Sequence, residues 1–134
     1  MYWAITLYPE AKSRIMKLVN QSGLKDKVDN WDNWKLYCDH ITIAHPKGCT
    51  QPEYNAVDKI LQMFEGRTVL FKLTSVGISE NAIALGVDAP TLNAHSHITI
   101  AIKEGHTPKE SNEIKVWEPL WCLTKFEGII QKCD

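Results

Sequence analysis

The pentapeptide HITIA occurs twice in this chain of 134 residues, beginning at His40 and again at His97. Both copies are rich in β-branched residues, which favours strands, and side chains two residues apart in a strand share a face. His40 therefore points the same way as Thr42, and His97 the same way as Thr99. If the two strands are neighbours, two imidazoles and two hydroxyls converge on one polar stripe, and the isoleucines between them are buried on the opposite face.

Such a stripe has the groups needed for acid–base chemistry on a phosphate. Imidazole titrates near neutral pH, so one histidine can take a proton from the attacking group while the other gives one to the leaving oxygen. Threonine hydroxyls can donate to the non-bridging phosphate oxygens, where negative charge lies in the transition state. The pattern predicts a catalytic set of His40, Thr42, His97 and Thr99 that needs neither a metal nor a cofactor.

The paired tetrads that begin at His40 and His97 resemble the two motifs of the 2H phosphoesterase (LigT-like) superfamily. The run FKLTSVG from Phe71, followed by ALGV from Ala84, is similar to the strands before the second motif of that family. The resemblance implies an α+β fold with two pseudo-symmetric lobes, mostly antiparallel sheets around a central cleft, and helices on the outside. It implies one catalytic tetrad from each lobe and a phosphodiesterase activity.

A finer likeness is carried by HITIAHPKG from His40 and by HITIAIKEGHTPKESNEI from His97. These segments resemble the cyclic phosphodiesterase domain of fungal and plant tRNA ligases. The chain is too short for the kinase and ligase domains of those enzymes, so the resemblance implies a stand-alone phosphodiesterase. Members of the superfamily open 2′,3′-cyclic phosphates, cleave 2′-5′ linkages or, in some viruses, destroy cyclic oligonucleotide signals, and the tetrads do not choose among these.

Other residues near the tetrads are candidates for binding a nucleotide. Trp34 lies in the loop before the first tetrad, and indole stacks well on nucleobases. Lys47 follows the first tetrad and Lys109 the second, where each can contact phosphate. His95 is a candidate extra phosphate contact, and a helix starting near Thr107 would offer free N–H groups to an anion. Two further polar candidates in that helix are Ser111 and Asn112.

A metal site is a competing interpretation of the first motif. Cys38, His40, His45 and Cys49 are all capable zinc ligands. In one extended strand His45 lies on the face opposite to Cys38 and His40, so only a sharp turn at Pro46 could gather all four. That interpretation predicts a zinc-stabilised interaction domain and leaves the second HITIA unexplained.

Two further alternatives concern the tetrads themselves. A catalytically silent nucleotide-binding module could keep the cleft for recognition, although binding needs donors and not two proton-transfer groups. The tetrads could also be two amphipathic strands that use histidine and threonine as ordinary strand residues.

The composition restricts the partners and the compartment. The formal net charge is -1, which offers no broad electrostatic footprint for long nucleic acid, so we expect a nucleotide or a short oligonucleotide as substrate. No obligate protein partner is evident. The four cysteines form no CxxC pair, the N-terminal residues do not resemble a signal peptide, and no apolar run approaches the roughly 20 residues that span a bilayer. These features predict a cytoplasmic protein with no membrane segment.

The periodicity predicts a single domain over residues 1–134 with mixed strands and helices, hence an α+β fold with a largely antiparallel sheet. Thr50 and Glu53 have the spacing of a capping box, and so do Thr107 and Glu110. The expected elements are a strand at 2–8, a helix from Pro9 to near Gly23, a loop at 24–34, a strand at 36–45, a helix ending near Gly66, strands at 67–76, 82–87 and 96–103, a helix from Thr107, and a last strand or strand pair at 120–131.

Overall fold

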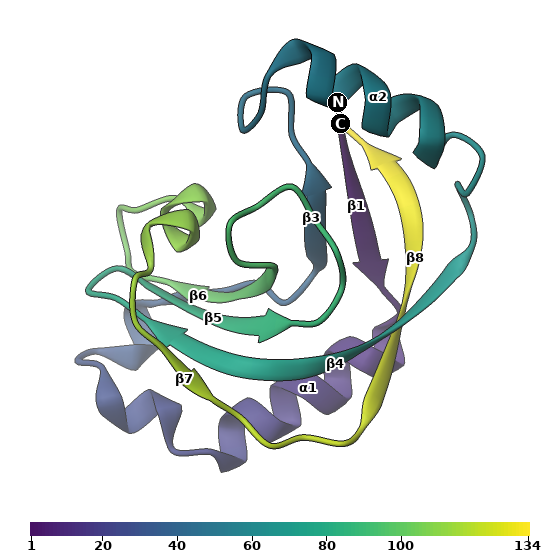
Figure 1. Ribbon diagram of the computed structural model, residues 1–134. Coiled ribbons are helices and arrows are strands. Elements are labelled where there is room, and N and C mark those ends of the chain that lie inside the picture. Colours follow the sequence, from purple (N-terminus) through teal and green to yellow (C-terminus); the bar gives the residue numbers. More distant parts are fainter.

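The computed structural model describes all 134 residues (Figure 1). Eight strands form one sheet in which every pairing is antiparallel, which confirms the α+β class. The strands are β1 (Tyr2–Leu7), β2 (Lys35–Leu36), β3 (His40–Ala44), β4 (Thr68–Ile78), β5 (Ala82–Val87), β6 (His97–Ile102), β7 (Trp117–Pro119) and β8 (Lys125–Cys133). The helices are α1 (Pro9–Gln21), α2 (Gln51–Leu61) and the short 3₁₀ helices η1 (Leu24–Lys27), η2 (Trp31–Asn33) and η3 (Pro108–Glu113).

Six of the strands close into a ring. The order is β6-β3-β1-β8-β4-β5, and β5 pairs back to β6. In Figure 1, β1, β3 and β8 lie side by side, with β1 antiparallel to both neighbours, while β4, β5 and β6 run across them. The strands that carry the two HITIA copies, β3 and β6, are neighbours where these two groups meet, and they are joined by the single pair Ile41–Ile98.

The hydrophobic core belongs to both groups of strands. A cluster of 24 buried residues includes Trp3 of β1, Ile41 of β3, Phe71 of β4, Ile98 of β6 and Phe126 of β8. Burial of this apolar surface is the main stabilising contribution to such a fold. Because the cluster spans the ring, the two groups of strands are held to each other by shared packing as well as by hydrogen bonds.

The two α-helices form where the sequence predicts them. Proline occupies the first turn of α1, and Ala11, Ile15 and Val19 form its buried face, whereas Leu18 is 41% exposed. At the start of α2 the Thr50 N–H donates to Glu53 Oε1 over 2.9 Å, which confirms the capping box. The predicted extension of this helix towards residue 66 is wrong, because α2 ends at residue 61 and turns follow.

The predicted strand 36–45 is broken into β2 and β3. Cys38 adopts a left-handed backbone conformation with φ of 69°. Before the break, the Cys38 N–H donates to the Thr99 carbonyl of β6, and after it the Asp39 carbonyl accepts from Leu7 of β1. The segment changes its pairing partner from β6 to β1 at this point, which one straight strand cannot do.

Three other segments differ in detail from the prediction. The loop 24–34 contains η1 and η2, and the helix near Thr107 is the six-residue 3₁₀ helix η3. In the final segment 120–131 the strand begins only at Lys125, because residues 120–124 carry the chain from β7, which pairs with β4, to β8, which lies between β1 and β4. No helix in the structure is both long enough and apolar enough to cross a bilayer.

Candidate functional site

The two HITIA copies lie side by side, as the sequence predicts. They run antiparallel with Ile41 opposite Ile98. This is the one residue pair between the two copies, because the chain before His40 pairs with β6 in a different register, with the Cys38 N–H donating to the Thr99 carbonyl. Side chains alternate along each strand, so the two histidines and two threonines lie on the face opposite the isoleucines.

The alternation of burial agrees with this arrangement. Ile41, Ile98 and Ile100 are fully buried and Ile43 is 8% exposed, so the isoleucine face belongs to the core. On the polar face His97 is buried, while the other three side chains are half-buried. The stripe therefore reaches solvent but is partly removed from water, and this strengthens the electrostatic interactions made there.

The second histidine is held in one tautomer. His97 Nδ1 lies 2.8 Å from the carbonyl oxygen of His95. A carbonyl only accepts, so Nδ1 carries the proton and donates, which leaves Nε2 as the free nitrogen of the neutral ring. Burial is the main cause that lowers the pKa of His97 below its usual value, and the hydrogen bond to His95 opposes this change.

The second threonine is also hydrogen-bonded. Thr99 Oγ1 lies 2.9 Å from Oγ of Ser111 on η3. Ser111 is 1% exposed, although the rest of η3 is mostly at the surface. From the sequence, Ser111 is predicted only as a contact of the ligand. In the structure it is buried and lies within hydrogen-bond distance of Thr99.

The first motif has a different environment. The ring of His40 packs against Tyr2 with centroids 5.6 Å apart. Neither its nitrogens nor the Thr42 hydroxyl makes a hydrogen bond within the protein, and since no buried polar side-chain atom lacks a partner, these atoms are not buried. Burial chiefly lowers the pKa of His40, the Asp39 carboxylate opposes this, and His97 lowers it further. The Asp39 carboxylate itself accepts a hydrogen bond from Lys12 of α1 over 2.6 Å.

The loop 88–96 between β5 and β6 borders the first motif (Figure 1). The Leu92 N–H donates to the Ile43 carbonyl over 2.8 Å, and the Asn93 side-chain amide reaches the Thr42 carbonyl at 3.5 Å. Within the loop, Thr91 Oγ1 and Ser96 Oγ are 2.8 Å apart. The loop therefore holds the backbone of β3 beside β6.

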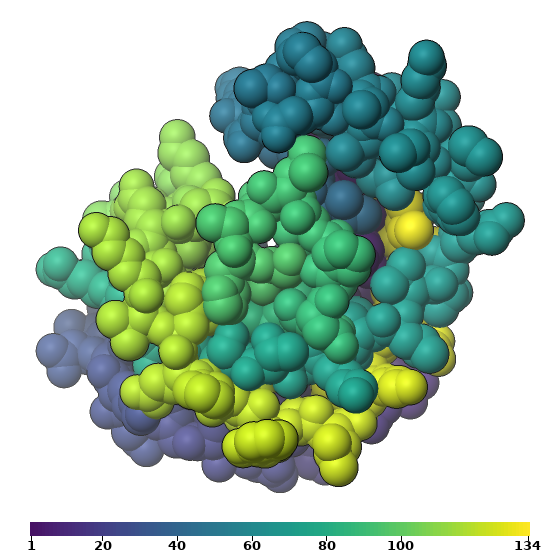
Figure 2. All heavy atoms as spheres, viewed as in Figure 1, coloured from purple at the N-terminus to yellow at the C-terminus, as the bar shows by residue number.

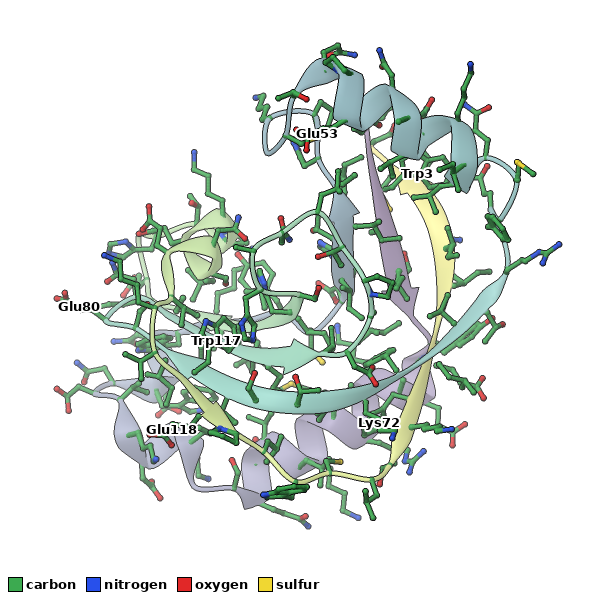
Figure 3. The ribbon with its side chains drawn as sticks, in the orientation of Figure 1. Trp3, Glu53, Lys72, Glu80, Trp117 and Glu118 are labelled. Carbon is green, nitrogen blue, oxygen red and sulfur yellow. The ribbon has the colours of Figure 1, made fainter.

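An aromatic stack lies next to the second motif. The ring of His95 is stacked on Trp117, and Ser75 Oγ is 3.0 Å from His95 Nε2 (Figure 3). The centroid of Trp117 is 6.1 Å from that of His97.

Glycine is required beneath this stack, because a Cβ on Gly86 would collide with Ser75 Oγ and one on Gly77 would lie 2.7 Å from Trp117. The sequence does not predict that Trp117 lies beside His97, because no spacing relates Trp117 to the two motifs. The pairing of β7 with β4 brings Trp117 to this position.

Trp34 is not an open stacking surface, contrary to the prediction. It is 7% exposed and belongs to the core, with its ring against Trp31 at 6.4 Å and its Nε1–H donating to the Asp29 carbonyl. The lysines predicted to contact the ligand, Lys47 and Lys109, are exposed in the turn after β3 and on η3.

The start of η3 does not offer the free anion site that the sequence predicts. The N–H of Thr107 donates to Glu110 Oε2 over 2.8 Å. A carboxylate therefore already occupies the position that an anionic ligand would take. His106 Nδ1 lies 3.0 Å from the same carboxyl group.

The four candidate zinc ligands do not form a metal site. The ring of Tyr2 packs against both His40 and His45, with centroid distances of 5.6 and 5.5 Å. Cys49 Sγ donates to the His45 carbonyl, and Cys38 is fully buried in the core. No three His, Cys, Asp or Glu side chains gather in a way that could hold a metal ion.

Two hollows lie away from the tetrads. One of about 890 Å³ is lined mainly by apolar side chains of α1, β4 and the segment around β7, and a second of about 500 Å³ adjoins η2. Neither contains a tetrad residue. The molecular surface is also indented between the part that carries α2 and the part that carries η3, beside the loop 88–96 (Figure 2), and β3 and β6 border this indentation in Figure 1.

Comparisons with protein-family models, with curated proteins and with solved structures found no match to this chain.

Proposed function

We propose that this protein is a phosphodiesterase that uses the paired histidines and threonines and requires no metal ion. The observation that carries the proposal is the Ile41–Ile98 pairing, which sets the two motifs side by side with their histidines and threonines on the face opposite the core. Two proton-transfer groups and two hydroxyl donors on one half-buried face are the groups needed to cleave a phosphodiester.

In this mechanism His97 is the general base. Its Nδ1–H is held by the His95 carbonyl, so the Nε2 lone pair is free to take a proton from water as the water oxygen bonds to phosphorus. His40 is the general acid and gives its proton to the leaving ribose oxygen as the phosphorus–oxygen bond breaks. The neighbouring Asp39 carboxylate favours the protonated form of His40 that this role needs.

Thr42 and Thr99 donate to the two non-bridging oxygens and stabilise the charge that develops on them. With water as the nucleophile the product is a phosphomonoester. Where a linear or cyclic 3′-5′ bond is cut, the 2′-hydroxyl of the substrate takes the place of water, and the product is a 2′,3′-cyclic phosphate.

The proposed substrates are 2′,3′-cyclic nucleotides or RNA ends, 2′-5′ oligonucleotides, or cyclic oligonucleotide signals. The near-neutral net charge favours small or short substrates over long RNA. The arrangement of β3-β1-β8 beside β6-β5-β4 fits the two-lobed fold of the 2H phosphoesterases, with one tetrad from each group.

The test is turnover of a panel of these three substrate classes by EDTA-treated protein. Wild type is compared with the His40→Ala/His97→Ala double variant, and the exposed His106→Ala variant is the matched control. We expect turnover of at least one class by wild type and by the control, and none by the double variant. Folded wild type that cleaves no member of the panel, or a double variant that is fully active, would overturn the proposal.

A further inference from the structure

The two motifs are identical in sequence but differ in how they are held. In the second motif both functional side chains have fixed partners, since His97 bonds to the His95 carbonyl at 2.8 Å and Thr99 is 2.9 Å from Ser111. In the first motif the His40 ring is held by packing against Tyr2, and neither that ring nor the Thr42 hydroxyl takes part in a hydrogen bond within the protein, so their polar atoms are not buried. Ordering a free side chain costs conformational entropy, which the second motif has already lost on folding.

Ser111 has a fixed position because η3 is attached to the sheet on both sides of it. Glu110 accepts from the Thr107 N–H and from the Asn81 side chain at 3.4 Å. On the other side Ile114 is buried in a cluster with the side chains of Ala82, Ala84 and Ile102. The buried Ser111 hydroxyl therefore has one place to point, and that place is Thr99.

The direction of this hydrogen bond determines what Thr99 can do. A hydroxyl has one hydrogen to donate and two lone pairs that accept. When Ser111 donates to Thr99, the hydrogen of Thr99 is free for a ligand oxygen, and accepting one hydrogen bond makes Thr99 a stronger donor. An anion beside Thr99 selects this direction, because an anion needs a donor.

We infer that His97, Thr99 and Ser111 form a preorganised half-site that binds the phosphate of the substrate, whereas His40 and Thr42 gain hydrogen-bond partners only when the phosphate is in place. Ser111 is the positioning residue of this half-site and acts through Thr99. The inference rests on the proposed function, since it takes a phosphodiester as the ligand.

The probe is dimethyl phosphate, a phosphodiester monoanion whose charge does not change near neutral pH. Its affinity is measured by NMR titration for wild type, Ser111→Ala, Thr99→Val and the matched variant Thr42→Val. Loss of one hydrogen bond in a partly buried site weakens binding about 5- to 10-fold. We expect that loss in Ser111→Ala and Thr99→Val, and a change of less than about twofold in Thr42→Val.

A double-mutant cycle separates positioning from general damage to the fold. Because Ser111 acts through Thr99, Ser111→Ala/Thr99→Val binds the probe no more weakly than Thr99→Val alone. Thr99→Ser retains the hydroxyl and keeps most of the affinity. Independent, additive losses from the two substitutions, equal losses in Thr42→Val and Thr99→Val, or no binding of the probe by wild type would each overturn the inference.

Turnover assays of the same variants distinguish the half-site from the proposed function. For an active enzyme we expect Ser111→Ala to raise KM more than it lowers kcat, and Thr42→Val to lower kcat. Wild type that binds the probe with the expected asymmetry but cleaves no substrate contradicts the phosphodiesterase and leaves the half-site standing. Active wild type with symmetric dependence on both threonines contradicts the half-site alone.

Discussion

The imidazole of His95 lies flat on the indole of Trp117, with ring centroids 3.8 Å apart and planes 10° from parallel. The same residue accepts the hydrogen bond of His97 through its backbone carbonyl. The stack and the Ser75 contact therefore fix the carbonyl that sets the tautomer of His97. The orientation of His97, the proposed base, therefore depends on the side chains of Ser75, His95 and Trp117.

Gly86→Ala tests this dependence. The added Cβ would collide with Ser75 Oγ and lie 2.8 Å from His95 Nε2, so His95 must shift. We expect a loss of stability of about 1–3 kcal/mol and a lower kcat. The matched control is Gly48→Ala, where nothing lies closer than 3.6 Å to the added atom. Denaturant unfolding and steady-state kinetics measure both effects, and an unchanged kcat contradicts the positioning role of His95.

The pH dependence of activity follows from the lowered pKa of both histidines. Activity rises with pH as His97 loses its proton and becomes a base, and it falls as His40 loses the proton it must donate. Because both pKa values lie below the ordinary value of about 6.5, we expect a bell-shaped kcat/KM profile with its maximum on the acid side of that value. A maximum well above pH 7 contradicts this assignment.

The Lys12–Asp39 pair tunes the pKa of His40. Asp39 raises this pKa against the effect of burial, and Lys12 partly neutralises Asp39. We expect Lys12→Met to raise the pKa of His40 and Asp39→Asn to lower it, as followed by NMR titration of the imidazole. Lys17→Met, on the exposed face of the same helix, is the control, and we expect it to leave the pKa of His40 unchanged. Shifts of the same sign in both test variants speak against this electrostatic link.

Stability also depends on the buried His97 and the half-buried His40. Above about pH 6.5 they are neutral in the folded and the unfolded chain and contribute no pH dependence. Below that value the unfolded chain binds protons first, so the free energy of unfolding decreases until the lowered folded-state pKa values are reached. His40→Gln/His97→Gln should flatten this decrease in denaturant titrations at several pH values, while His106→Gln retains it. An equally steep decrease in the double variant contradicts the linkage.

The sequence predicts the elements that local rules control. The two HITIA strands, the proline at the start of α1 and the Thr50–Glu53 capping box all follow from periodicity and spacing. These features depend on neighbours in the chain, and the structure confirms them.

The errors occur where a distant segment decides the outcome. The break at Cys38 follows from a change of pairing partner between β6 and β1. No local pattern distinguishes Trp34 from Trp117 in the sequence. In the structure Trp34 packs against Trp31, whereas the pairing of β7 with β4 brings Trp117 beside His97. The role of Ser111 depends on where η3 lies on the sheet, which no local pattern specifies.

The closed ring of strands has a consequence for self-association. Each of its six strands has a partner on both sides, which leaves β2 and β7 as the strands with one partner. Long, flat edge strands recruit other chains, and proteins limit this with short edges, lysine and proline. Here β2 has two residues and includes Lys35, and β7 has three and ends at Pro119. The sheet therefore offers other molecules almost no backbone on which to add a strand, and this protects the folded chain against edge-to-edge aggregation.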